Sequence, residues 1–163
     1  MFGAGREAVG YRVISGVGEL PGQLDELGAR ALVVDVEPLV AFWDTGQAEL
    51  RDGVTRVLEQ VAGTGVRTVV FATNSSRTLS ALPVVPALRV GYLASAGKPL
   101  RRAPYRDLPR PAAVVGDQVA TDGVLARRLG FTFLHYRPDV PDIPVGPRVM
   151  RFLGRPIHAL LFS

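Results

Sequence analysis

Two carboxylates, Asp35 and Glu37, stand two residues apart directly after the apolar run 31–34. A run rich in β-branched residues is typical of a buried strand, so Asp35 is predicted at the carboxyl end of that strand. Open α/β sheets bind their ligands at this end of their strands. Because a carboxylate is costly to remove from water, we expect Asp35 to have a metal ion, a charged partner or a reaction to perform.

Three further polar groups follow later predicted strands. They are Thr73 with Asn74, Ser75 and Ser76; Lys98; and Asp117 with Asp122. The carboxyl ends of parallel strands meet at one edge of a sheet, so these side chains can converge with Asp35 and Glu37. The carboxylates would suit a magnesium ion, while the hydroxyl and the ammonium would suit phosphate oxygens. The sequence therefore predicts a magnesium and phosphate site.

Each of these groups has an ordinary structural explanation when it is taken alone. The acid pair could cap a turn, and Thr73 with its neighbours could cap a helix. Lys98 could be a surface lysine, and Asp122 could be a charge at a helix N-terminus. Their order along the chain, one group after each of four predicted strands, favours a shared site.

The elements that would position these groups follow from the spacing of apolar residues. Helices are predicted over 20–27, 47–62, 75–82 and 121–129, and strands over 11–14, 31–36, 67–72, 89–93, 112–115 and 131–135. Strands that alternate with helices are typical of βαβ units. The predicted fold class is therefore α/β, a single doubly wound, Rossmann-like domain with a mostly parallel sheet. The connections between strands are too short to hold an inserted cap domain.

Three regions are expected along the chain: an N-terminal leader at 1–18, a core at 19–145 and a basic, apolar C-terminal segment at 146–163. The last segment carries Arg148 and Arg151 among apolar residues. A helix of this kind can rest on an anionic membrane. We favour the other interpretation, a terminal helix that closes the core.

Composition limits the kind of metal site that the chain can build. There is no cysteine, which excludes disulfides, thiolate catalysis and cysteine-bound zinc. Two histidines are too few for a multi-histidine site, so oxygen ligands and magnesium are expected. Lys98 is the one lysine among the 19 basic residues. This is either chance or the mark of a site that needs a compact ammonium group instead of a guanidinium.

Charge and hydropathy bear on location and partners. The formal net charge is +4 and the arginines are scattered, so we expect a solvated surface and no nucleic-acid partner. Residues 1–10 lack the pattern of a signal peptide, and no apolar run approaches the ~20 residues of a membrane span. We expect a cytoplasmic protein that is at most peripheral to the inner face of a membrane.

The order of the polar groups resembles that of the haloacid dehalogenase-like (HAD) phosphohydrolases. Response-regulator receivers, by contrast, keep all their acidic residues ahead of the threonine and the lysine. Residues 35–44 are similar, without a gap, to the first motif of subclass IIIA phosphatases of the YqeG type, a group similar to phosphatidylglycerophosphate phosphatases. Residues 70–74, 96–99 and 116–122 resemble the later motifs, and 116–122 (Gly-Asp-Gln-Val-Ala-Thr-Asp) is the most specific of them. The resemblance extends from about Tyr11 to the C-terminus.

This resemblance implies a magnesium-dependent phosphomonoesterase. Asp35 would attack phosphorus and form an aspartyl-phosphate, while Glu37 would serve first as the general acid and then as the general base. Magnesium would be held by Asp35, Asp117 and the backbone carbonyl of Glu37. Asp122 would orient a metal-bound water or Lys98.

The resemblance also implies how phosphate and substrate are bound. Thr73, Asn74 and Lys98 would hold the phosphate. Without an inserted cap the site would be open, which suits a phosphorylated small molecule or a lipid head group. Three arginines that follow Lys98 could contact an anionic substrate: Arg101, Arg102 and Arg106.

The first motif departs from the family pattern at three positions. Glu37 replaces an aspartate and is one methylene longer, whereas proton transfer requires heavy atoms within ~2.6–3.2 Å. Leu39 replaces a threonine, and Pro38 replaces an asparagine. These three replacements in the first motif are what a slow phosphatase would show. The alternative is a catalytically impaired relative that binds phosphate and metal as an interaction or regulatory module.

Overall fold

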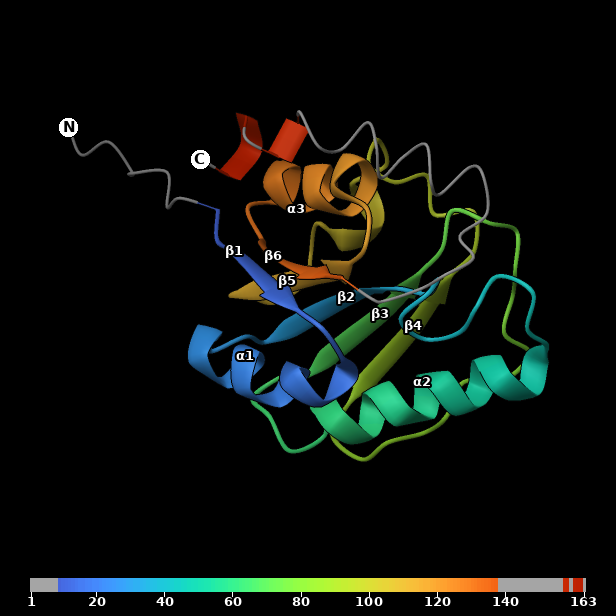
Figure 1. Cartoon of the computed structure of the whole chain (residues 1–163). Helices are drawn as coiled ribbons and strands as arrows, with labels where there is room; N and C mark the ends of the chain where they lie inside the picture. The colour runs from blue at the N-terminus through green and yellow to red at the C-terminus, as the bar shows by residue number, and fades with distance from the viewer. Residues whose placement is uncertain (1–8, 138–156, 159, 163) are drawn as a thin grey trace.

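Six parallel strands form the centre of the computed structural model, which describes residues 9–137, 157–158 and 160–162. The strands are β1 (Tyr11–Ile14), β2 (Ala31–Asp35), β3 (Thr68–Ala72), β4 (Arg89–Leu93), β5 (Ala112–Gly116) and β6 (Thr132–Tyr136). Their order across the sheet is β1-β6-β5-β2-β3-β4 (Figure 1). From β2 the chain adds β3 and β4 on one side and later places β5 and β6 on the other. The sheet thus has a switch point between β2 and β5, and the α/β, Rossmann-like class is confirmed.

Helices cover both faces of this sheet. Figure 1 shows α1 (Leu20–Leu27) and α2 (Gln47–Val61) on one face and α3 (Val124–Leu129) on the other. Alternate residues of β2 pack into the two resulting clusters, Leu32 and Val34 into one, Ala31 and Val33 into the other. All five residues of β2 are buried, which explains its unbroken apolar run.

The segment 75–82, predicted as a helix, is irregular. Side chains compete here for the backbone groups that a helix would use. The Thr73 hydroxyl accepts a hydrogen bond from the Ser75 N–H at 3.0 Å, and the Ser75 hydroxyl accepts one from the Arg77 N–H. The side chain of Gln47, in α2, binds the backbone of residues 78 and 80. The helix prediction is therefore wrong, although the helix over 47–62 is confirmed as α2.

Two other boundaries differ from prediction. The sheet includes β1, where Tyr11 pairs with Phe133 of β6, so the core begins inside the range predicted as a leader (1–18). The helix predicted over 121–129 starts as a π-helical turn, Val119–Gly123, before α3. This turn begins three residues after the end of β5 and carries Asp122, one of the predicted site residues.

The C-terminal segment predicted at 146–163 lies mostly outside the described residues. In its described part, Leu161 and Phe162 pack against the cluster on the α3 face of the sheet. Within the described ranges, no helix combines the length and apolar character that crossing a bilayer requires. Both interpretations of residues 146–156, the favoured terminal helix that closes the core and the alternative contact with a membrane, concern a part of the chain outside the described residues.

Close packing of α2 fixes the chain that follows β2. Any Cβ at Gly53 of α2 would lie 1.9 Å from the carbonyl oxygen of Val40. The turn at Val40 is closed by its N–H, which donates to the Val36 carbonyl at 2.8 Å. Gly53 therefore allows the helix to hold the loop that contains Glu37.

We predict that Gly53→Ala lowers the free energy of unfolding by about 1–3 kcal/mol, because the helix or the loop must move to admit a methyl group. Urea denaturation followed by circular dichroism measures the change. Gly22→Ala is the matched control: Gly22 is also helical, but its Cβ would meet open space, so a gain of about 0.5 kcal/mol is expected. Equal effects of the two substitutions would contradict the packing argument.

Candidate active site

The carboxyl ends of β2 and β5 bring three buried aspartates together. Asp35 ends β2, Asp117 directly follows β5, and Asp122 lies in the π-helical turn behind it. One carboxylate oxygen from each lies within 4.8 Å of the others. These strands flank the switch point of the sheet, where α/β folds bind their ligands. Three of the residues predicted for the site therefore meet where the topology places a ligand.

Lys98 joins two of these carboxylates. Its ammonium group donates hydrogen bonds of 2.7 Å to Oδ1 of Asp35 and of 2.7 Å to Oδ1 of Asp122. The lysine side chain is 2% exposed and that of Asp122 is fully buried, so water screens these ion pairs weakly. The single lysine of the chain is thus the charge that holds the acidic residues together.

Charge and burial set the protonation of this cluster. Burial raises the pKa of the Asp35 carboxyl well above its usual range; the Asp122 carboxylate adds to the shift, and Lys98 opposes it. Burial lowers the pKa of Lys98, but the carboxylates of Asp122 and Asp35 more than offset this, and the net shift is upward. Lys98 therefore stays charged, and it is shared between two acidic groups.

A glycine makes room for Asp122. Any Cβ at Gly116, the last residue of β5, would lie 2.2 Å from Oδ2 of Asp122. The same oxygen accepts a hydrogen bond from the Gln118 N–H at 3.3 Å. The carboxylate thus lies directly over the end of the strand, where a side chain at residue 116 would displace it.

The site has the composition of a divalent cation site. Its donors are carboxylate oxygens, which magnesium prefers, and no sulfur or imidazole belongs to the group of three aspartates. Lys98 pairs with two of the three aspartates, and its single positive charge offsets only one of the charges that the three carboxylates carry when ionised. The three aspartates could therefore hold a divalent cation such as Mg²⁺.

Asn74 positions Lys98. Its side-chain amide donates to the Lys98 carbonyl at 2.9 Å, and its Oδ1 accepts from the Lys98 N–H at 2.8 Å. The neighbouring loops also pair, since the Ala96 N–H donates to the Thr73 carbonyl at 2.8 Å. Predicted as a phosphate ligand, Asn74 here fixes the backbone of the lysine that faces the aspartates.

Glu37 belongs to a second polar network. Its Oε2 accepts a 2.8 Å hydrogen bond from the Thr73 hydroxyl, and its Oε1 lies 3.7 Å from a guanidinium nitrogen of Arg77. The Thr73 hydroxyl is also 2.9 Å from that of Ser75. The side chain of Glu37 lies outside the group of carboxylates that could share a cation. Binding of a metal by its backbone carbonyl stays a prediction.

Arg77 is the site residue that the sequence did not reveal. Its guanidinium donates to the Phe42 carbonyl at 2.8 Å and to the carbonyl and hydroxyl of Thr45 at 2.6 and 2.7 Å. It thus ties the loop after β3 to the loop after β2. Tyr92 lies beside it and donates to the Arg77 carbonyl; burial raises the pKa of Tyr92 to about 12.

His135 is a half-buried structural histidine. Its Nδ1 lies 2.7 Å from the Tyr11 hydroxyl, and its ring stacks on Phe133 at 5.3 Å between centroids. Burial, with a smaller contribution from Arg137, lowers the pKa of His135 to about 4. The ring is therefore neutral near pH 7 and packs among aromatic side chains.

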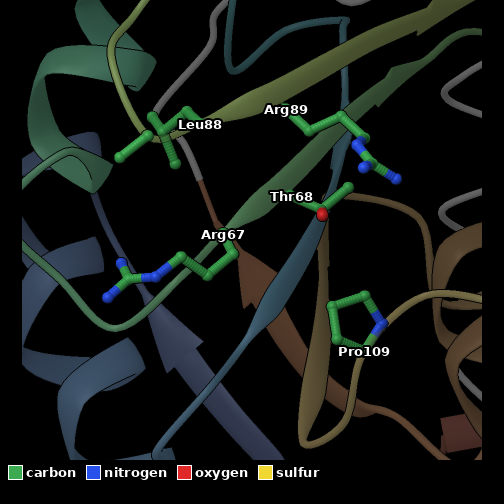
Figure 2. Close-up of a pocket in the computed structure, with 6 residues that line it drawn as sticks. Arg67, Thr68, Leu88, Arg89 and Pro109 are labelled. Atoms are coloured by element: carbon green, nitrogen blue, oxygen red, sulfur yellow. The ribbon is translucent and has the colours of Figure 1, made fainter.

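A pocket at the opposite edge of the sheet is a weaker candidate. It lies at the amino ends of β3 and β4, and its lining includes Arg67, Thr68, Arg89 and Pro109. Figure 2 shows the guanidinium groups of Arg67 and Arg89 pointing away from each other. They do not converge on one anion, and the pocket is distant from the aspartates.

Comparison of the chain with family models, with curated proteins and with solved structures gives no match in any of the three.

We predict that Lys98→Met lowers the free energy of unfolding by about 3–5 kcal/mol in EDTA, because it leaves two buried carboxylates without their cation. Urea denaturation measures the loss, and added Mg²⁺ should recover part of it. Arg128→Met is the control: Arg128 is exposed and its guanidinium donates to the Pro99 carbonyl, so a change below about 1 kcal/mol is expected. Equal losses in the two variants would show that the aspartates do not depend on the ammonium.

Proposed function

We propose that this protein is a magnesium-dependent phosphomonoesterase of the HAD type that acts through an aspartyl-phosphate on Asp35. The observation that carries the proposal is the buried Lys98 ammonium, which bridges Asp35 and Asp122 at 2.7 Å beside Asp117. A nucleophilic carboxylate, a fixed cation and an oxygen-only metal site are what phosphoryl transfer needs.

The proposed reaction has two steps. An Asp35 carboxylate oxygen attacks phosphorus, the ester P–O bond breaks, and the departing oxygen takes up a proton. Water then attacks phosphorus, the bond to Asp35 breaks with its electron pair returning to the carboxylate, and inorganic phosphate leaves. Lys98 and the Thr73 hydroxyl would donate hydrogen bonds to the phosphoryl oxygens. Glu37 is the candidate for the general acid of the first step and the general base of the second.

The proposed metal ligands are Asp35, Asp117 and Asp122, together with the backbone carbonyl of Glu37. When bound, Mg²⁺ would offset negative charge on the transferring phosphoryl group. Without a cap the site would be open to a phosphorylated small molecule or a lipid head group. Three exposed arginines in the segment after Lys98 would favour an anionic substrate: Arg101, Arg102 and Arg106.

The first test is hydrolysis of 4-nitrophenyl phosphate by the purified chain. We expect Mg²⁺-dependent release of nitrophenol that EDTA abolishes. Asp35→Asn should reduce kcat at least about 10³-fold, because it removes the nucleophile. Asp107→Asn makes the same change at an exposed position and should leave kcat unaltered. Full activity in Asp35→Asn would refute the assignment of the nucleophile.

A second candidate function is favoured by one observation, the hydrogen bond and ion pair that engage both oxygens of Glu37. A carboxylate held in this way is poorly available for proton transfer. The chain would then be a catalytically impaired relative that binds phosphate and metal as an interaction or regulatory module. Metal binding without any turnover would support this candidate over the phosphatase.

Shortening Glu37 separates the two candidates. We expect Glu37→Asp to raise kcat about 10-fold or more, because the shorter arm withdraws the carboxylate from Thr73 and Arg77 and frees it for proton transfer. Glu59→Asp, the same change at an exposed helical position, is the control and should leave kcat unaltered. A fall in kcat for Glu37→Asp would mean that the glutamate is already placed well for its role.

A further inference from the structure

The two polar networks of the site divide its chemistry between them. Lys98 binds Asp35 and Asp122, whereas Thr73 and Arg77 bind Glu37. The groups for attack on phosphorus therefore lie in one network, and the candidate acid and base lies in the other.

The guanidinium beside Glu37 is held in place by the loop after β2. Arg77 donates to three backbone carbonyls, those of Phe42, Thr45 and Gly46, and to the Thr45 hydroxyl. Its side chain is 14% exposed and that of Glu37 is 7% exposed, so the pair is weakly screened. Because these hydrogen bonds anchor Arg77, movement of the Glu37 carboxylate away from the guanidinium separates two opposite charges.

The two steps of the reaction depend on Glu37 to different extents. A leaving group that is stable as an anion, such as nitrophenolate, departs without a proton donor, so Asp35 can be phosphorylated without help from Glu37. Attack by water on the aspartyl-phosphate gains most from a base that accepts the water's proton. A restrained Glu37 therefore slows the second step more than the first.

We propose that Arg77 is a positioning residue that restrains Glu37, so that the aspartyl-phosphate on Asp35 accumulates during turnover. This inference rests on the proposed function. In the first step the Asp35–phosphorus bond forms as the ester bond breaks and the phenolate departs with its electron pair. In the second, water supplies the new oxygen, its proton passes to solvent, and Asp35 regains its electron pair.

The experiment is rapid-quench hydrolysis of 4-nitrophenyl phosphate with Mg²⁺. Nitrophenol is measured against time, and the quenched protein is weighed by intact mass spectrometry. We expect a burst of about one nitrophenol per chain and a protein that carries one phosphoryl group, absent in Asp35→Asn. Arg77→Met should speed loss of this group about 10-fold or more, and Arg77→Lys, which keeps the cation, should retain the slow loss. Arg89→Met is the control and should behave as the unaltered chain.

Glu37→Gln tests the inference without altering Arg77. It keeps an acceptor for the Thr73 hydroxyl but cannot accept a proton from water. Under the proposal, loss of the phosphoryl group slows by less than about threefold, whereas an effective base contributes roughly 10²–10⁴-fold. A slowing of 10² or more would overturn the restraint of Glu37, even if Arg77→Met fails to fold.

The outcomes separate this inference from the proposed function. Steady turnover with neither a burst nor a phosphorylated protein would overturn the inference and leave the phosphatase standing. Absence of both turnover and phosphorylated protein would overturn the two together. If the protein is phosphorylated but Arg77→Met loses its phosphoryl group at the unaltered rate, the positioning role of Arg77 is refuted.

Discussion

The site depends on the ammonium group of Lys98 between Asp35 and Asp122. Buried carboxylates this close repel one another, and each would otherwise gain by taking up a proton. An ammonium is compact enough to donate 2.7 Å hydrogen bonds to both, whereas a planar guanidinium needs more room and offers its donors in a fixed fork. This requirement gives a physical reason for a lysine here in a chain whose other basic residues are arginines. Asn74 supports the Lys98 ion pairs indirectly, because its two hydrogen bonds fix the backbone of Lys98.

The parallel sheet supplies the geometry for this interaction. Asp35 and Asp117 come from strands β2 and β5, which are far apart in sequence but adjacent in the sheet, because the chain reverses its direction of winding between them. Helices cover β2 on both faces, so a polar side chain can reach a ligand only where the strand ends. Two glycines allow close contacts around the site. Gly116 lets Asp122 lie against the end of β5, and Gly53 lets α2 lie against the loop after β2. Both approaches would be blocked by a single methyl group.

The sequence predicts the elements that are buried on both faces and the residues that end them. β2, β3 and β5 are apolar runs, so their ends could be located, and with them Asp35, Thr73 and Asp117. Two features could not be placed correctly from the sequence. The segment after Thr73 is shaped by hydrogen bonds from side chains to backbone across some 30 residues, as between Arg77 and Phe42, and no local pattern encodes such a contact. β1 is short and only Ile14 of it is buried, so it could be located as a strand but not assigned to the sheet.

Thr73 holds Glu37 through one hydrogen atom. Its hydroxyl carries a single proton, which in this structure is donated to Glu37. A phosphoryl oxygen bound by the same hydroxyl would require that proton, so Glu37 would lose a hydrogen bond as the phosphate arrives. The carboxylate would then be held by Arg77 alone, at 3.7 Å. Removal of the phosphate would restore the original bond. Under the proposed function, the longer arm of Glu37 would therefore affect more than its reach, because it lets the carboxylate contact both Thr73, where phosphate would bind, and the anchored Arg77.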